Sequence, residues 1–137
     1  MTTLSAHPLV SGTASGTVLK LAEPLSLWGG LEPTTGEITD RRHPQSGTSV
    51  TGRILVMPSG RGSSSASSIL LEAVRLHTAP AAIITAEIDG ILALGAVVAR
   101  ELYSVAPPLL VINADDYTQL VDGQTVSISQ EGEINLL

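Results

Sequence analysis

The residues best suited to chemistry lie in the stretch GRGSSSASS, residues 60–68, which follows an apolar run. Glycine-rich backbone at the start of a helix presents free N–H donors, and the helix dipole adds partial positive charge there. Arg61 offers a two-pronged donor for a carboxylate or a phosphate. The hydroxyls of Ser63, Ser64 and Ser65 can donate to an anion, and a deprotonated hydroxyl can act as a base. The stretch therefore predicts a site for a small anionic ligand.

Other motif interpretations fit this stretch less well. A phosphate-binding P-loop needs a lysine after its last glycine, and none is present. Gly60 and Gly62 match half of the dinucleotide pattern G-x-G-x-x-G, but Ser65 replaces the third glycine. Glu87 follows roughly where a ribose-binding acid is expected, so a nucleotide-binding module stays an alternative. The simplest interpretation is that the serines only cap a helix.

A second polar cluster lies in a turn-rich segment, where Asp40 and His43 are three residues apart. A carboxylate and an imidazole at this spacing can orient a ligand or each other. On spacing alone, an ordinary polar turn ending at Pro44 is the favoured interpretation. The three histidines are dispersed and cysteine is absent, so we expect no metal site within this chain.

The elements that must position these residues alternate along the middle of the chain. We expect strands in 50–58, 80–87 and 107–113, with a helix after the serines and another over 89–103 capped by Asp89. This order predicts a parallel sheet. Strands within 16–30 and a closing hairpin around Glu131 and Gly132 add a second layer. The prediction is a single α/β domain of the β/β/α type, with a flexible arm at 1–8 and the domain at 9–137.

Composition excludes several functional classes. The chain has 137 residues, a net charge of −6 and only 2% aromatic residues, which does not suit a nucleic-acid surface. No apolar run reaches the ~18 residues of a membrane span, and no leader pattern is visible. The absence of cysteine excludes disulfides and thiolate ligands. We expect a cytoplasmic protein that binds neither nucleic acid nor membrane.

Four segments together resemble the small subunit of aconitase X: EPLSLWGGLEPTTGEITDRRHP, GRILVMPSGRGSSSASSILLEAVR, APAAIITAEIDGILALGAVVARELY and PPLLVI. The resemblance covers about residues 9–137. It implies the swivelling β/β/α domain of the aconitase superfamily, docked on a large subunit as a heterodimer or a higher assembly. It also implies that an iron–sulfur cluster belongs to the large subunit and that this chain binds none alone.

The activity that this resemblance implies is dehydration of a small hydroxy acid. The cluster on the large subunit binds the substrate hydroxyl as a Lewis acid, while a serine of this chain removes the proton next to the carboxylate. Bacterial members resemble cis-3-hydroxy-L-proline dehydratases, which form Δ1-pyrroline-2-carboxylate, and archaeal members resemble mevalonate 5-phosphate dehydratases. The low content of charged residues favours the bacterial activity.

The residue roles implied by the resemblance depend on the Gly–Ser loop. Aconitases proper have Gly-Ser-Ser-Arg-Glu there, whereas this chain continues from Gly62 into three serines and Ala66, with the arginine placed before them. We expect Ser63 to be the base, with Ser64 as second choice. The residues expected to contact substrate are Arg61, Gly62, Ser65, Asp40, His43, Gly29 and Gly30.

Overall fold

The computed structural model describes residues 2–62 and 64–137. Its strands are β1 (Thr2–Ser5), β2 (His7–Val10), β3 (Ala14–Lys20), β4 (Leu31–Glu32), β5 (Glu37–Ile38), β6 (Ile54–Met57), β7 (Ala82–Thr85), β8 (Leu109–Val111), β9 (Thr125–Ile128) and β10 (Glu133–Leu136). Its helices are α1 (Leu27–Gly30), α2 (Ala66–Arg75), α3 (Gly90–Tyr103) and α4 (Ala114–Tyr117). None of the helices in these residues has the length and apolar character needed to cross a bilayer.

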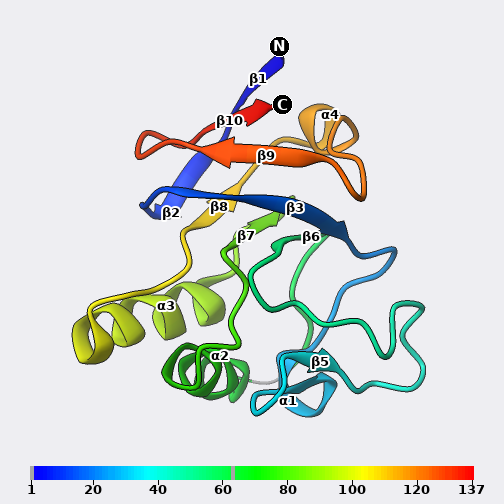
Figure 1. Cartoon of the computed structure of the whole chain (residues 1–137), viewed down its shortest axis with the longest axis vertical. Coiled ribbons are helices and arrows are strands. Elements are labelled where there is room, and N and C mark those ends of the chain that lie inside the picture. Colours follow the sequence, from blue (N-terminus) through cyan, green and yellow to red (C-terminus); the bar gives the residue numbers. More distant parts are fainter. Residues whose placement is uncertain (1, 63) are drawn as a thin grey trace.

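Eight of the described strands form one curled sheet in the order β1-β10-β9-β3-β6-β7-β8-β2. Strands β6, β7 and β8 pair in parallel, as the alternation of strands and helices predicted, and β3, which we expected in the second layer, also pairs in parallel with β6. The neighbours β9, β10 and β1 pair antiparallel, and the expected closing hairpin is formed by β9 and β10. Only Ala6 separates β1 from β2, although they lie at opposite ends of the order. The sheet therefore curls until its two edges approach each other, close to a barrel (Figure 1).

Two hydrophobic cores lie on the two faces of the parallel strands. In β6, Ile54 and Val56 belong to the core inside the curled sheet, whereas Leu55 and Met57 belong to the core beneath the helices. Side chains alternate between faces along a strand, so a strand covered on both sides is apolar throughout. This arrangement explains the unbroken apolar runs in the sequence.

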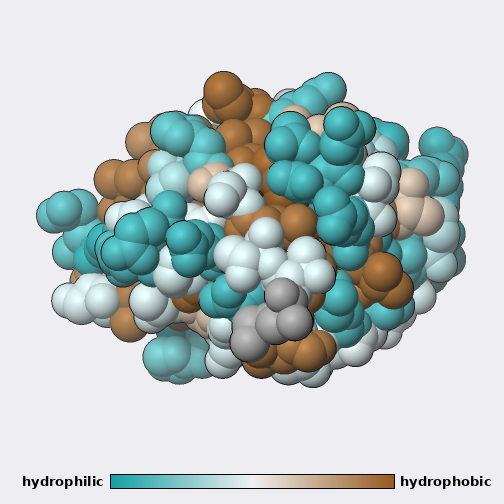
Figure 2. All heavy atoms as spheres, turned by 90° about the horizontal axis from the view of Figure 1, so that it is seen from above, coloured by the Kyte–Doolittle hydropathy of each residue, from teal (hydrophilic) through white to brown (hydrophobic). Residues whose placement is uncertain are grey.

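Helices α2 and α3 form the third layer, below the sheet in Figure 1. They bury Leu70 and Val74 of α2 together with Leu92 and Ala96 of α3. The opposite end of the molecule carries β1, β9 and β10, and Figure 2 shows hydrophilic residues over much of that face with hydrophobic ones scattered among them. The β/β/α prediction is confirmed.

The amino-terminal segment differs from the flexible arm that we expected. Residues 2–5 pair with β10 in register from Thr2 opposite Leu136, and residues 7–10 pair with β8 and form one edge of the sheet. Leu4 is buried in the core inside the sheet. Short strands of this kind give weak local signals, and only the neighbouring strands supply their hydrogen-bond partners.

Candidate active site

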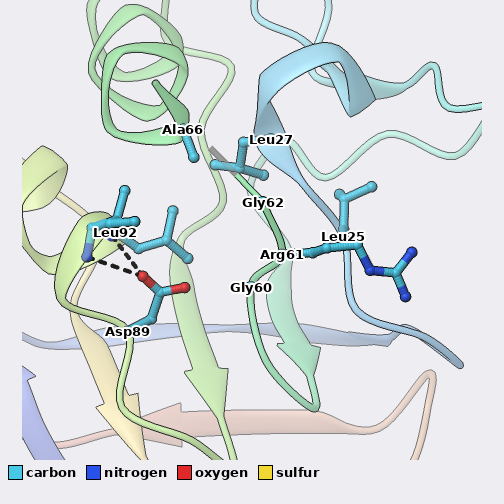
Figure 3. Close-up of a pocket in the computed structure, with 9 residues that line it drawn as sticks. Leu25, Leu27, Gly60, Arg61, Gly62, Ala66, Asp89 and Leu92 are labelled. Atoms are coloured by element: carbon cyan, nitrogen blue, oxygen red, sulfur yellow. Dashed lines mark hydrogen bonds between the residues drawn. The ribbon is translucent and has the colours of Figure 1, made fainter. Parts of the chain in front are cut away.

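A small pocket lies where three parallel strands end. The segments that follow the carboxyl ends of these strands line it. They are residues 25–27 after β3, 60–62 and 66 after β6, and 89–92 after β7. Ligands in open α/β sheets bind outside the carboxyl ends of the strands. The pocket has a volume of about 130 Å³, and Figure 3 shows its lining: Leu25, Leu27, Gly60, Arg61, Gly62, Ala66, Asp89, Ile91 and Leu92.

The residues packed against the loop leave no space for a side chain at Gly60 and little at Gly62. A Cβ at position 60 would collide with Oδ2 of Asp89, so only glycine lets the loop pass beside that carboxylate. Gly62 has a φ of +89°, and a Cβ there would lie 3.0 Å from the hydroxyl oxygen of Ser26. The loop is therefore held between α3 on one side and the segment leading into α1 on the other.

The serines follow this loop at the start of α2. Ser65 occupies the N-cap position of the helix without a side-chain cap hydrogen bond among the described residues, and its carbonyl accepts a hydrogen bond from the Ser68 N–H at 3.1 Å. Ser64 is exposed, and its carbonyl accepts from the Ser67 hydroxyl at 2.9 Å. Ser63, our first choice as base, lies outside the described residues. The loop thus places at least one serine hydroxyl, that of Ser64, at the exposed end of the helix.

Asp89 is the N-cap of α3, as its position in the sequence predicted. Its Oδ1 accepts hydrogen bonds from the N–H groups of Ile91 at 3.1 Å and Leu92 at 3.0 Å. Its Oδ2 accepts none from the described residues and points toward the pocket (Figure 3). One oxygen therefore stabilises the helix, and the other is directed at the space where a ligand would lie.

Arg61 contributes less positive charge to the pocket than the sequence suggested. Its backbone lines the pocket, but its side chain is exposed and points away from Asp89 (Figure 3). The start of α3 is already neutralised, because Asp89 occupies two of its N–H groups. The charged group directed into the pocket is therefore a carboxylate, beside the positive end of α2.

Asp40 and His43 do not line the pocket. The His43 ring is 5% exposed, and its Nδ1 accepts a hydrogen bond from the Gln45 N–H at 3.0 Å. Its Nε2 must then carry the proton, and it donates to the Glu23 carbonyl at 3.1 Å. Asp40 accepts through Oδ1 from the Arg42 N–H at 3.0 Å, which makes a local turn. Both residues shape the loop between β5 and β6.

The Gly29–Gly30 pair lies in the short element α1, beside the pocket wall. Trp28 and Gly29 depart from helical φ and ψ, so α1 is a tight turn rather than a regular helix. Gly30 packs near Leu25 and Asp40, where a Cβ would lie 3.0 Å from Leu25 Cδ1. The turn leaves the Trp28 side chain 57% exposed.

Several pocket residues were not predicted as functional. Leu25, Leu27, Ile91 and Leu92 form the apolar walls, and each resembles an ordinary core residue in the sequence. A local signal existed only for Asp89, as a helix cap. In the part of the chain that the structure describes, no group of three histidine, aspartate or glutamate side chains could hold a metal ion, and the sequence has no cysteine.

Comparison with known proteins agrees with this architecture. Residues 3–136 match the family model described as the aconitase X swivel domain. The chain superposes on the crystal structure of the holo-form of Thermococcus kodakaraensis aconitase X with a TM-score of 0.88 and 33% identity, covering 100% of this chain and 99% of that one.

Two relatives carry named activities. A cis-3-hydroxy-L-proline dehydratase of Pseudomonas aeruginosa is 45% identical over 85% of this chain, which spans only 21% of that enzyme. A phosphomevalonate dehydratase small subunit of Methanosarcina mazei is 37% identical over 92% of this chain and 85% of the relative. The chain therefore corresponds in length to a small subunit and to about a fifth of the longer dehydratase.

Proposed function

The chain belongs to the aconitase X swivel-domain family, and we propose that it forms one half of a dehydratase active site completed by a large subunit. The single observation that carries the proposal is the glycine–serine loop, held between α1 and α3 at the rim of the pocket. At about 130 Å³, the pocket is smaller than the ~300 Å³ at which complete small-molecule sites begin. A site shared with another surface accounts for this size.

The substrate that we propose is cis-3-hydroxy-L-proline, with mevalonate 5-phosphate as the alternative. The first choice follows the 45% identity to the Pseudomonas aeruginosa enzyme, and the alternative follows the likeness in length to the archaeal small subunit. Dehydration of the first substrate removes the proton on C2 and the hydroxyl on C3 as water. The resulting enamine tautomerises to Δ1-pyrroline-2-carboxylate, so no oxidant or reductant is needed.

The role of this chain is to supply the base. We assign proton removal to Ser63 or Ser64, with Ser65 holding the start of α2. A serine hydroxyl is a weak base near neutral pH, and its alkoxide needs stabilisation by neighbouring N–H donors. The positive end of the ten-residue α2 provides such stabilisation at this position.

The iron–sulfur cluster expected of an aconitase-like enzyme is placed by our proposal on the large subunit. The chain has no cysteine thiolate, and the described residues contain no three-ligand group, so its side chains do not fit a cluster. The contribution of this chain is therefore confined to proton transfer and substrate contact. The cytoplasmic location stays a prediction.

The test is reconstitution of the two subunits with alanine variants of the loop. We expect the Ser63→Ala or the Ser64→Ala complex to lose about 10²–10⁴-fold in kcat, the contribution of a positioned base. Ser68→Ala is the matched control, since this exposed serine lies within α2, after the loop that carries the proposed base. Its complex should retain normal turnover, and the melting temperatures of all three variants should match the wild type.

Two results would contradict the proposal. One is a kcat within about twofold of wild type in both complexes, that of Ser63→Ala and that of Ser64→Ala. The other is tight binding of a nucleotide by the isolated chain in calorimetry, which would favour a stand-alone binding module.

A further inference from the structure

The free carboxylate oxygen of Asp89 is the one charged side-chain group that the described residues direct into the pocket. Oδ1 is fully engaged by the N–H groups of Ile91 and Leu92, whereas no described residue donates to Oδ2. The carboxylate is half-buried and is fixed in orientation by its two cap hydrogen bonds. A fixed, half-buried oxygen without a donor is ready to accept a hydrogen bond from a ligand.

The surroundings of this oxygen select the charge of the ligand. The guanidinium of Arg61 points away, and the ion pair of the described residues joins Glu72 and Arg75 on the exposed surface of α2 instead. The nearest walls are apolar, from Leu27 and Leu92. A cationic donor bound there would gain a charge-assisted hydrogen bond, while an added anion would face repulsion from Asp89.

We propose that Asp89 recognises the ammonium group of an amino-acid substrate through Oδ2. This inference rests on the proposed function and makes Asp89 a specificity-determining residue of the shared site. A secondary ammonium such as that of a pyrrolidine ring places two N–H donors beside methylene groups. The carboxylate of Asp89 accepts a hydrogen bond from this ammonium, and the leucine side chains pack against the methylene groups. The same geometry disfavours a phosphorylated hydroxy acid, which has no cation to offer.

The test measures ligand preference rather than turnover. L-proline and tetrahydrofuran-2-carboxylate differ in the ammonium, which a ring oxygen replaces, and calorimetry on the assembled complex gives their Kd values. We expect the wild-type complex to prefer proline by about tenfold or more, as a charge-assisted hydrogen bond implies. In the Asp89→Asn complex the preference should fall to within about twofold, because the neutral amide no longer attracts the ammonium.

The variants are chosen so that a folding defect does not imitate the effect. Asparagine and serine are both good N-caps, so Asp89→Asn and Asp89→Ser each keep the start of α3 while removing the charge. Asp115→Asn on α4 is the matched control, because it removes one exposed carboxylate outside the pocket lining. Its complex should keep the wild-type preference.

The outcomes separate this inference from the proposed function. A preference for proline that persists in both Asp89 variants, or that is absent from the wild-type complex, overturns the role of Asp89. Failure of the wild-type complex to dehydrate either proposed substrate overturns the proposed function, whatever the proline preference shows. Loss of the preference in both variants, with Asp115→Asn unchanged, supports the inference.

Discussion

The carboxylate of Asp89 lies directly against Gly60, and no side chain would fit between them. Asp89 also caps α3, so the position of the helix and the position of the glycine–serine loop are set by one residue. The contact joins residues from two different strand–helix connections. The loop that carries the proposed base is thereby held at a fixed distance from the start of α3.

Gly60→Ala should displace the loop. The new Cβ must push away either Asp89 or the loop backbone, and overpacking of this kind costs about 1–3 kcal/mol of unfolding free energy. We expect a lower midpoint in urea and a lower kcat in the reconstituted complex. Gly90→Ala is the control, since a Cβ there meets open space at the first position of α3 and should be neutral or slightly stabilising. Partial recovery of stability in Gly60→Ala/Asp89→Ser would locate the clash; equal stability of Gly60→Ala and wild type would contradict it.

Gly95→Ala should separate the two helices. A Cβ at position 95 would lie 2.8 Å from the backbone carbonyl oxygen of Ser67, in the first turn of α2. A backbone carbonyl cannot rotate out of the way as the end of a flexible side chain can, so the whole of α2, with its serines, must move. We expect a loss of about 1–3 kcal/mol in chemical denaturation. Leu94→Ala alters an exposed neighbour and should change stability by less than about 0.5 kcal/mol.

His43→Ala should destabilise the fold without acting on the pocket directly. The substitution removes the acceptor of the Gln45 N–H and the donor to the Glu23 carbonyl, in a side chain that is 5% exposed. Unsatisfied buried groups cost about 1–3 kcal/mol, so we expect a loss of that size in urea denaturation. His7→Ala on the exposed face of β2 should be close to neutral. A His43→Ala protein that keeps full stability but loses substrate affinity would contradict this prediction and support a role of His43 in substrate binding.

Trp28→Ala should weaken docking of the large subunit. The indole is 57% exposed next to Leu27 of the pocket wall, and tryptophan is enriched among the residues that dominate the binding energy of protein interfaces. We expect the Kd for the large subunit to rise about tenfold or more. Val121→Ala, with the same exposure but outside the pocket lining, should leave it unchanged. The sequence has one tryptophan, so a fluorine label on it should shift in NMR on docking; an unshifted signal in a formed complex would exclude contact.

Tyr117→Phe should reduce the loss of stability in alkali. Burial raises the pKa of the Tyr117 phenol above its usual 10.0, so folding favours the neutral form. That contribution is complete below about pH 10 and is lost at higher pH, as the unfolded phenol ionises first. Phenylalanine cannot ionise, so the unfolding free energy of Tyr117→Phe should fall less above pH 10.

At neutral pH the Tyr117→Phe variant should be as stable as wild type or slightly more stable. The hydroxyl is buried and has no hydrogen-bond partner among the described residues, so its removal costs no bond. Lys20 lies over the ring at 4.7 Å, and burial lowers its pKa from 10.5, which makes its own contribution rise with pH in both proteins. Tyr103→Phe is the control. An equal alkaline slope in Tyr117→Phe and wild type would contradict the assignment.

The elements near the middle of the chain could be predicted because their signals are local. Asp89 precedes an apolar helical pattern and caps it with its side chain, and the serines precede α2, where Ser65 takes the N-cap position without a side-chain cap hydrogen bond in the described part of the chain. Residues 54–57 and 82–84 form unbroken apolar runs, which fit a sheet covered on both faces. The glycine–serine loop at the end of β6 could likewise be singled out as the candidate site from its composition.

The features that could not be predicted from the sequence depend on contacts between distant residues, which only the tertiary structure shows. The pairing of residues 2–5 with β10 and the curling of the sheet arise from partners more than a hundred residues away. The same is true within the pocket, where the fold places Leu25 and Asp89 on either side of Gly60. Sequence determined which residues are charged, small or apolar, because those are properties of each residue. The direction of the Asp89 oxygen and the burial of His43 follow from packing, which no single segment contains.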